Sequence, residues 1–552
     1  METVMCSMTF LLALSCLVSF TSAAPQVQLG KTTLVGRDVT LLKQDFFGGV
    51  PFAEPPIGNL RLKPPVLKTR LTQPAFDASN FGLACLQSGV PSGLISEDCL
   101  TINVFRPSGT AANASLPVLF WTYGGGFDAG ASAIYNGSAI VAQSVVRGTP
   151  LIYVNFNYRL GPLGFPQGQE ADDRRALNLA LKDQLAALEW VHQNIGLFGG
   201  DKNKVTVFGE SAGAIMTAIL FLNSPIQRLA RGAIFESGSA GTALTFNAAR
   251  REINWQNFVS GVSRCASIAT GGNTFGCLRA ANSSDILQGL LKSLADAPEK
   301  FGFDPTLDGP GGIFPDIPSK LFERGHFARL PFIAGTNLDE GTAFVPPSIN
   351  ASSQIRDSII ANFSPPIVHP SLLENAADEL LRLYPDDPVL GSPFNTGSET
   401  FGLSSVFKQA SAIDGDINFQ AQRRFWMQTA SKAGVKTFGY LFTEPQPNAN
   451  PAVGVSHGSE VRFVYGQPEN PTPSATRISS IMIDYWVSFT TSLDPNDGRG
   501  IPRPIWSRYT PHNQVLMQLN GANLTLIPDD YRSEQIDFIN SDPAVFHHRR
   551  SL

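Results

Sequence analysis

Residues 209–213 (GESAG) place a serine between two glycines and form the only G-x-S-x-G sequence in the chain. An apolar, strand-like segment, residues 205–208, comes before them, and a helix-forming stretch, residues 212–222, follows. A sharp strand-to-helix turn of this kind needs small residues two positions before and two after its centre, and it exposes the central hydroxyl. The pattern predicts that Ser211 is a nucleophile. The alternative is a glycine-rich turn without chemistry.

Three consecutive glycines, residues 124–126, follow the apolar run 117–121 after two further residues. Because glycine has no side chain, the backbone N–H groups of such a loop can face a ligand without steric cost. Together with the N–H group of Ala212, they are candidates to hold a negatively charged oxygen that develops during a reaction. The alternatives are a flexible loop or a phosphate cradle. A phosphate loop would need a GK[ST] sequence, which does not follow here.

A serine nucleophile needs a base, and the chain has seven histidines. In turns of the G-x-S-x-G type the chain order is serine, acid, histidine. His192 is excluded because it precedes the serine, and His326 and His369 because they leave too little chain for an acid-bearing strand. His512 follows a turn, and His547 and His548 lie in the polar tail. His457 remains, in a glycine-flanked loop after the expected strand 437–441. The alternative is a surface-loop histidine.

The acid is expected between Ser211 and His457, just after a strand. Residues 335–342 (GTNLDEGT) fit this requirement, because they follow the apolar segment 332–334. Either Asp339 or Glu340 can orient an imidazole and stabilise it once it is protonated. Spacing alone does not choose between the two.

These groups must be positioned by a sheet. Apolar, strand-like runs at residues 117–121, 151–155, 205–208, 331–334 and 437–441 alternate with helical patterns, clearest at 181–195 and 212–222. Buried strands that alternate with helices predict an α/β fold with a mostly parallel central sheet covered on both faces. Residues 26–42 alternate and turn at Gly30 and Gly36, which predicts a short antiparallel edge. Residues 245–325 and 345–430 are mostly helical in pattern and are expected to be cap and wall insertions.

The N-terminus is typical of export. Residues 1–23 combine a short apolar run with small residues, which predicts a signal peptide cleaved after Ala23 or Ala24 and leaves one catalytic domain, residues 24–552. Four cysteines then remain, and an even number in an exported chain indicates disulfides. Local pairing, Cys85 with Cys99 and Cys265 with Cys277, is the simplest of three connectivities. Six sequons are glycosylation candidates: Asn113, Asn136, Asn282, Asn350, Asn362 and Asn523.

Composition excludes several classes of function. With 552 residues, 43% of them hydrophobic, the chain can bury a large core. A formal net charge of −5 argues against non-specific nucleic-acid binding, which needs clustered Lys and Arg. CxxC and HxxxH spacings do not occur, so the pattern does not indicate a metal site or a metal cofactor. No apolar stretch after the signal peptide is long enough to span a membrane and the C-terminus is polar, so we expect a secreted, extracellular protein without a stable membrane anchor.

Taken together, the motifs resemble those of the type-B carboxylesterases, the family that includes fungal lipases, sterol esterases and cholinesterases. The similarity spans almost the whole mature chain and keeps the family order. It rests on residues 48–56 (GGVPFAEPP), 96–100 (SEDCL), 124–126, 157–159 (NYR), 198–201 (FGGD), 209–213, 339–342 (DEGT) and 457–460 (HGSE).

The resemblance implies an α/β-hydrolase fold and the hydrolysis of neutral carboxylic esters through an acyl-enzyme, without a cofactor. It implies that Glu340 is the acid, in a triad with Ser211 and His457. It places the oxyanion donors at the N–H groups of Gly125, Gly126 and Ala212. It also supports the two local disulfide pairings.

The first expected disulfide loop, residues 86–98 (LQSGVPSGLISED), bears on the substrate. A choline head group needs an aromatic face, and this loop, which carries it in cholinesterases, has no aromatic residue. The loop is also too short for the long flap of interfacial lipases, so we expect an open entrance and action on soluble as well as lipid-like esters. An interfacial lipase or sterol esterase and a feruloyl-type esterase remain alternatives. A non-catalytic binding protein is a remote one, because both Ser211 and His457 are present.

Overall fold

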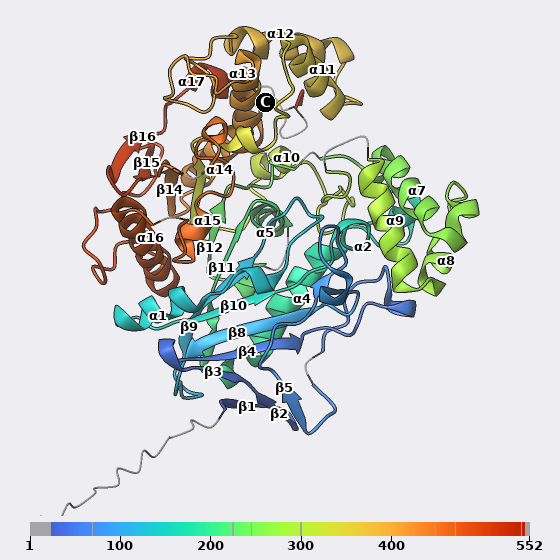
Figure 1. Cartoon of the computed structure of the whole chain (residues 1–552), viewed down its shortest axis with the longest axis vertical. Coiled ribbons are helices and arrows are strands. Elements are labelled where there is room, and N and C mark those ends of the chain that lie inside the picture. The colour runs from blue at the N-terminus through green and yellow to red at the C-terminus, as the bar shows by residue number, and fades with distance from the viewer. Residues whose placement is uncertain are drawn as a thin grey trace, which may run out of the picture.

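An 11-stranded mixed sheet organises the computed structural model, which describes residues 24–546 except 69, 224–225, 244, 298–300, 448, 470 and 542–543 (Figure 1). The predicted signal peptide, residues 1–23, and the tail histidines, residues 547–548, lie outside the described residues. In spatial order the strands are β16 (Thr525–Pro528), β15 (Val515–Leu519), β14 (Thr437–Phe442), β13 (Phe332–Asn337), β12 (Gly232–Glu236), β11 (Gly200–Glu210), β9 (Leu116–Thr122), β10 (Ile152–Phe156), β8 (Thr101–Pro107), β4 (Gln44–Pro51) and β3 (Arg37–Val39).

The strands from β15 to β10 run parallel, and β16, β8, β4 and β3 join antiparallel at the two edges. This arrangement confirms the predicted mostly parallel sheet. Four of the parallel strands, β10, β12, β13 and β14, are short and buried along their whole length. β1 (Gln26–Leu29) and β2 (Thr32–Val35) pair antiparallel, as the alternation predicted, but they form a separate small sheet with β5 (Ala75–Asp77).

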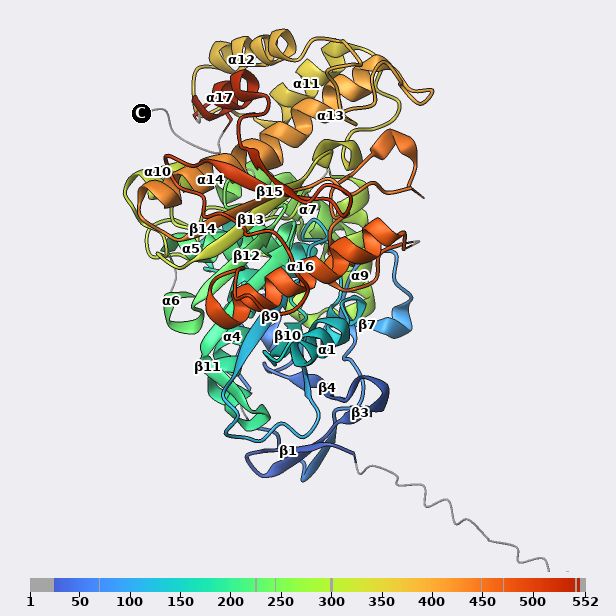
Figure 2. The ribbon, with the colours of Figure 1, turned by 90° about the vertical axis from the view of Figure 1, so that its left-hand side faces the viewer.

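Helices cover both faces of the sheet (Figure 2). α1 (Ser138–Val146) and α16 (Pro473–Ser492) lie side by side on one face, and α4 (Leu179–Asn194) and α5 (Ala212–Asn223) lie on the other. The predicted helix at 181–195 is therefore α4. It is followed by a short 3₁₀ turn that ends at Gly199, whose φ of +87° suits glycine and turns the chain into β11.

A second apolar core lies above the carboxyl ends of the strands, in the upper part of Figure 1. It is formed by four helices and the segments that join them: α11 (Ser352–Asn362), α12 (Pro370–Leu383), α13 (Ser405–Gly415) and α17 (Ser533–Ser541). Arg532, just before α17, forms a 2.6 Å ion pair with Asp416 beyond α13, and the Tyr384 hydroxyl donates to the same carboxylate. The C-terminal segment is thus tied to helices far from it in sequence. That residues 24–552 form one catalytic domain stays a prediction.

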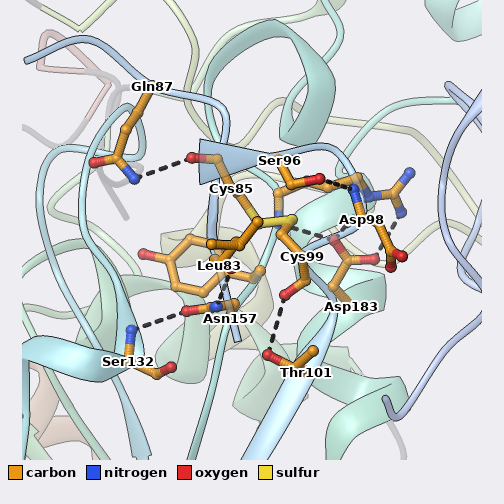
Figure 3. Close-up of a disulfide and its surroundings, with 12 residues drawn as sticks. Leu83, Cys85, Gln87, Ser96, Asp98, Cys99, Thr101, Ser132, Asn157 and Asp183 are labelled. Carbon is orange, nitrogen blue, oxygen red and sulfur yellow. Dashed lines mark hydrogen bonds and ion pairs between the residues drawn. A yellow bond between two sulfur atoms is a disulfide. The ribbon is translucent and has the colours of Figure 1, made fainter. Parts of the chain in front are cut away.

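Both predicted disulfides form: Cys85 with Cys99 (Figure 3) and Cys265 with Cys277. The second lies among the helices α7 (Glu252–Gly261), α8 (Phe275–Ala280) and α9 (Ser283–Ala295), within the region predicted to be helical. All six sequon asparagines are exposed, as glycosylation requires. Over the described ranges, we find no helix with the length and apolar character needed to cross a membrane.

Candidate active site

Ser211 occupies a strained turn between β11 and α5. β11 ends at Glu210, α5 begins at Ala212, and Ser211 between them has a φ of +51°. This left-handed conformation costs a non-glycine residue about 1–3 kcal/mol, so the surroundings must enforce it. The Ser211 N–H group donates to the Glu236 carbonyl at 2.9 Å, which fixes the turn against β12.

The two glycines of the motif have a packing reason. A side chain at Gly209 or Gly213 would fall against the backbone of Thr122, at the end of the neighbouring strand β9. Only residues without a Cβ allow the turn to approach β9 this closely. The spacing that predicted the turn is therefore the spacing that this contact requires.

The glycine loop after β9 presents backbone donors. Gly125 and Gly126 have φ angles of +105° and +62°, and both border the same cavity as Ser211 and Ala212. Among the described residues, the N–H groups of Gly125, Gly126 and Ala212 donate to no other group. The N–H of Ala212 is also one of the unpaired donors at the start of α5, where the helix dipole favours negative charge.

His457 and Glu340 are in direct contact. The Nδ1 atom of His457 lies 2.6 Å from Oε2 of Glu340, whose side chain is fully buried. The other carboxylate oxygen, Oε1, accepts hydrogen bonds from the Ser237 hydroxyl at 2.6 Å and from the Asn337 N–H at 2.7 Å. Glu340 is therefore held in place on both sides.

Asp339, the other acid that spacing left open, has a different position. Its carboxylate accepts hydrogen bonds from the Ser392 hydroxyl and from the N–H groups of Phe394 and Val455, at 2.8–2.9 Å. Burial raises the pKa of Asp339 to about 6. Because Val455 lies two residues before His457, Asp339 fastens the histidine loop to the 392–394 segment, whereas Glu340 faces the imidazole.

The second imidazole nitrogen of His457 points toward the serine side. Its Nε2 lies 3.2 Å from Oε1 of Glu210, and within the described residues it has no hydrogen bond, including none to Ser211. Ser211 and His457 border the same cavity, and such bonds often shorten only when a substrate is bound. The rings of Phe344 and Phe419 pack on the imidazole, with centroids 5.0 and 4.7 Å away. Phe419 lies in a π-helical turn between α13 and α14 (Ala421–Lys432).

Further carboxylates surround this pair. Burial raises the pKa of Glu210 to about 8 and that of Glu460 to about 7, and it raises the pKa of Glu236 well above its usual value. Burial lowers the pKa of His457, but the negative charges of Glu340 and Glu210 outweigh it and raise this pKa to about 9. The site thus stabilises an imidazolium.

Sequence reasoning did not single out these supporting residues. Glu460 accepts from the Asn337 amide at 2.6 Å and from the Ser237 hydroxyl at 3.2 Å, and Glu236 accepts from Nε1 of Trp486 at 2.6 Å. Two signals were present: Glu210 is the second residue of the GESAG motif, and Glu460 is the last residue of HGSE. Asn337 lies within the predicted acid segment 335–342, although its own role was not predicted, and nothing in the sequence around Glu236 pointed to the site.

A cavity of about 690 Å³ opens above Ser211, a volume within the usual range for small-molecule sites. The second core supplies much of its apolar wall, through Ile349, Ile355, Ile359, Phe363, Ile413 and Ile417. The ion-paired Arg251 and Asp304 form part of a more polar side. Among the described residues that line the cavity, none comes from the disulfide loop 86–98. Among all residues that the structure describes, no group of three His, Cys, Asp or Glu side chains has metal-binding geometry.

Residues 23–539 match the model of the carboxylesterase family. The chain belongs to this family. It is 33% identical to "Lipase 2" of Geotrichum candidum, over 97% of this chain and 99% of that protein, and 33% identical to "Secreted lipase 1" of Botryotinia fuckeliana, over 95% and 94%. The solved structure of Aspergillus niger EstA covers 95% of this chain and 99% of its own, with a TM-score of 0.82 and 27% identity. This carboxylesterase has the α/β-hydrolase fold and hydrolyses carboxylic esters.

The different contacts of the two acids in this carboxylesterase give a first prediction. Glu340→Gln should lower kcat by about 10³- to 10⁴-fold, because an amide cannot stabilise the charged imidazole. Asp339→Asn should lower the melting temperature and leave most of kcat, because it disturbs the loop anchor rather than the imidazole contact. Steady-state kinetics and thermal unfolding of both variants check this. Equal losses of kcat would contradict it.

The carboxylates around His457 give a prediction on pH. The imidazole must be neutral to accept a proton, so kcat/KM should rise with pH through an apparent pKa above the usual 6.5. Glu210→Gln removes a carboxyl group that favours the imidazolium once it is ionised, so it should lower this apparent pKa. The buried Glu444, which contacts Ser474 and Gly521, provides the control Glu444→Gln, with no shift expected. Superimposable profiles for wild type and Glu210→Gln would refute the electrostatic assignment.

Proposed function

We propose that this carboxylesterase acts through a Ser211–His457–Glu340 triad. The Ser211 hydroxyl attacks the ester carbonyl, and Nε2 of His457 takes the hydroxyl proton. His457 then protonates the departing alcohol, and an acyl group stays on Ser211. Water, activated by the same imidazole, releases the acid and restores the serine. The observation that carries the proposal is that Ser211, in its strained turn, and His457, which is paired with the buried Glu340, border one cavity.

The backbone N–H groups of Gly125, Gly126 and Ala212 hold the oxyanion in this proposal. Their support is that they border the cavity beside Ser211 and are not used by other acceptors among the described residues. Donors fixed before the reaction stabilise the tetrahedral intermediate more than the planar ester, which is the source of the rate gain. Glu340 keeps Nδ1 of His457 as a donor, so that Nε2 faces the serine.

The cavity supports esters with an apolar acyl group. The isoleucines and Phe363 of the second core offer such a group a continuous apolar wall. Relatives of this chain are named lipases, which agrees with an apolar acyl group. Because the loop 86–98 contributes no residue to the described lining, it supports an entrance open to dissolved as well as lipid-like esters. Interfacial lipase or sterol esterase action and feruloyl-type action are the alternatives.

We also propose that the enzyme is secreted after removal of residues 1–23. The support is the apolar N-terminal segment, the two disulfides, the six exposed sequon asparagines and a relative named a secreted lipase. Apart from the ester and water, the proposed reaction uses only side chains and backbone groups of this chain.

The proposed mechanism is tested with purified protein and a panel of 4-nitrophenyl esters of increasing acyl length, a triacylglycerol, a sterol ester and a methyl hydroxycinnamate. We expect turnover of the aliphatic esters, and we expect Ser211→Ala to remove it while the melting temperature stays close to that of wild type, since only one oxygen atom is lost. A folded Ser211→Ala protein that keeps most of its activity would end the mechanism. If the enzyme prefers the sterol ester or the hydroxycinnamate ester, sterol esterase or feruloyl-type action would replace the proposed class of aliphatic esters.

The open entrance is tested by measuring the rate against the concentration of a short-chain ester taken through its solubility limit. We expect a smooth saturating curve, because no flap has to open at an interface. A sharp rise in rate at the limit would mean that another segment closes the cavity in solution.

A further inference from the structure

The disulfide loop that does not line the cavity is fastened instead to the loop that carries the oxyanion donors. Gln87, two residues after Cys85, is only 4% exposed. Its Nε2 donates to the Gly130 carbonyl at 2.9 Å, and its Oε1 accepts from the Gly130 N–H at 2.9 Å. One side-chain amide thus pairs with both backbone groups of a single glycine, 43 residues away in sequence.

Gly130 closes the turn that begins at the oxyanion donors. The Gly125 carbonyl accepts from the N–H groups of Asp128 and Ala129, at 3.2 and 3.1 Å, so residues 125–129 form a compact turn. Gly130 follows with a φ of +121°, and a side chain there would fall against the ring of Tyr123. The position of Gly130 therefore sets where the turn can lie.

The other side of the disulfide is fastened to the same loop (Figure 3). The Asn157 amide donates to the Leu83 carbonyl at 2.9 Å, and its oxygen accepts from the N–H of Ser132 at 2.9 Å. Cys85 lies between Leu83 and Gln87, and its bond to Cys99 ties this short segment to the start of β8. The disulfide thus holds a segment that contacts the chain after the glycines at two points: Gln87 binds Gly130, and Leu83 is linked to Ser132 through Asn157.

We propose that Gln87 is a positioning residue of the oxyanion loop, and that the Cys85–Cys99 disulfide keeps it in place. The proposal rests on the proposed function of Gly125 and Gly126. Oxyanion donors act at about 2.7–3.1 Å from the oxyanion, and a misplacement of about 1 Å costs on the order of 10²-fold in rate. A buried amide that fixes both groups of Gly130 limits such movement.

The test uses Gln87→Met, which keeps the length of the side chain and loses both hydrogen bonds with Gly130 as well as the one that Gln87 donates to the Cys85 carbonyl at 3.1 Å. We expect kcat to fall by about 10- to 100-fold with little change in KM, because the oxyanion forms only after binding. The control is Gln44→Met: Gln44 is equally buried and donates to the Ser138 carbonyl at 2.7 Å, on the strand β4. It should lower the melting temperature by a similar amount and leave kcat unchanged.

A second readout separates positioning from general damage. An alkyl trifluoromethyl ketone adds the Ser211 hydroxyl across its carbonyl, so that the ketone oxygen becomes an oxyanion at the loop and the serine proton moves to His457. The matched methyl ketone binds without this adduct. We expect Gln87→Met to weaken the trifluoromethyl ketone by the same factor as kcat, and to leave the methyl ketone unchanged. Gln87→Glu, which keeps the acceptor for the Gly130 N–H and lacks the donor, should weaken the trifluoromethyl ketone as well.

The outcomes distinguish the two proposals. If wild type does not prefer the trifluoromethyl ketone to the methyl ketone, the serine mechanism itself fails. If wild type prefers it and both Gln87 variants keep that preference, or if Gln44→Met loses kcat as much as Gln87→Met, the anchor is refuted. Where Gln87→Met does not fold, the comparison of Gln87→Glu with wild type decides alone.

Discussion

The close approach of the nucleophile turn to strand β9 is the constraint on which the site depends. Gly209 and Gly213 lie against the backbone of Thr122, so the serine between them is held in a left-handed conformation that it would not choose alone. The same approach brings the first N–H of α5 beside the glycine loop that follows β9. The proposed nucleophile and the proposed backbone donors are therefore positioned by one contact between neighbouring strands.

Electrostatics add a second constraint, because one imidazole shares a buried region with several carboxylates. Hydrogen bonds from Ser237 and Asn337 hold Glu340 against the imidazole, while burial favours the protonated forms of Glu210 and Glu460. In a region of low dielectric His457, Glu210 and Glu460 titrate as a set, so each proton gained by one changes the proton affinity of the others. The carboxylates that raise the proton affinity of His457 also slow the loss of its proton. This limits how far stabilisation of the imidazolium benefits turnover.

The parts of the fold and the site that could be predicted are those encoded in short stretches of sequence. The GESAG turn, the glycines 124–126 and five parallel strands each show a local pattern. Chain order led to His457 and to the segment with Asp339 and Glu340, and the family resemblance pointed to Glu340. The choice between Asp339 and Glu340 could not follow from spacing, because adjacent side chains diverge and only the three-dimensional path of the 392–394 and 455–457 segments decides which faces the imidazole. Strands β4, β8, β12, β15 and β16 were not predicted. Without β12, Glu236 and Ser237 were missed too, because they reach the site only through the order of the strands.

The elements that form the second core are synthesised at different times. Its helices α11–α13 leave the ribosome before His457, but α17, which completes that core, is among the last elements to be made. Because chains begin to fold from the N-terminus as they emerge, the sheet with its serine turn can assemble while the wall of the cavity still lacks its C-terminal support. The apolar residues of the cavity wall therefore lack part of their core until the last elements have been made, and the ion pair of Arg532 with Asp416 joins the segment before α17 to the rest of that core.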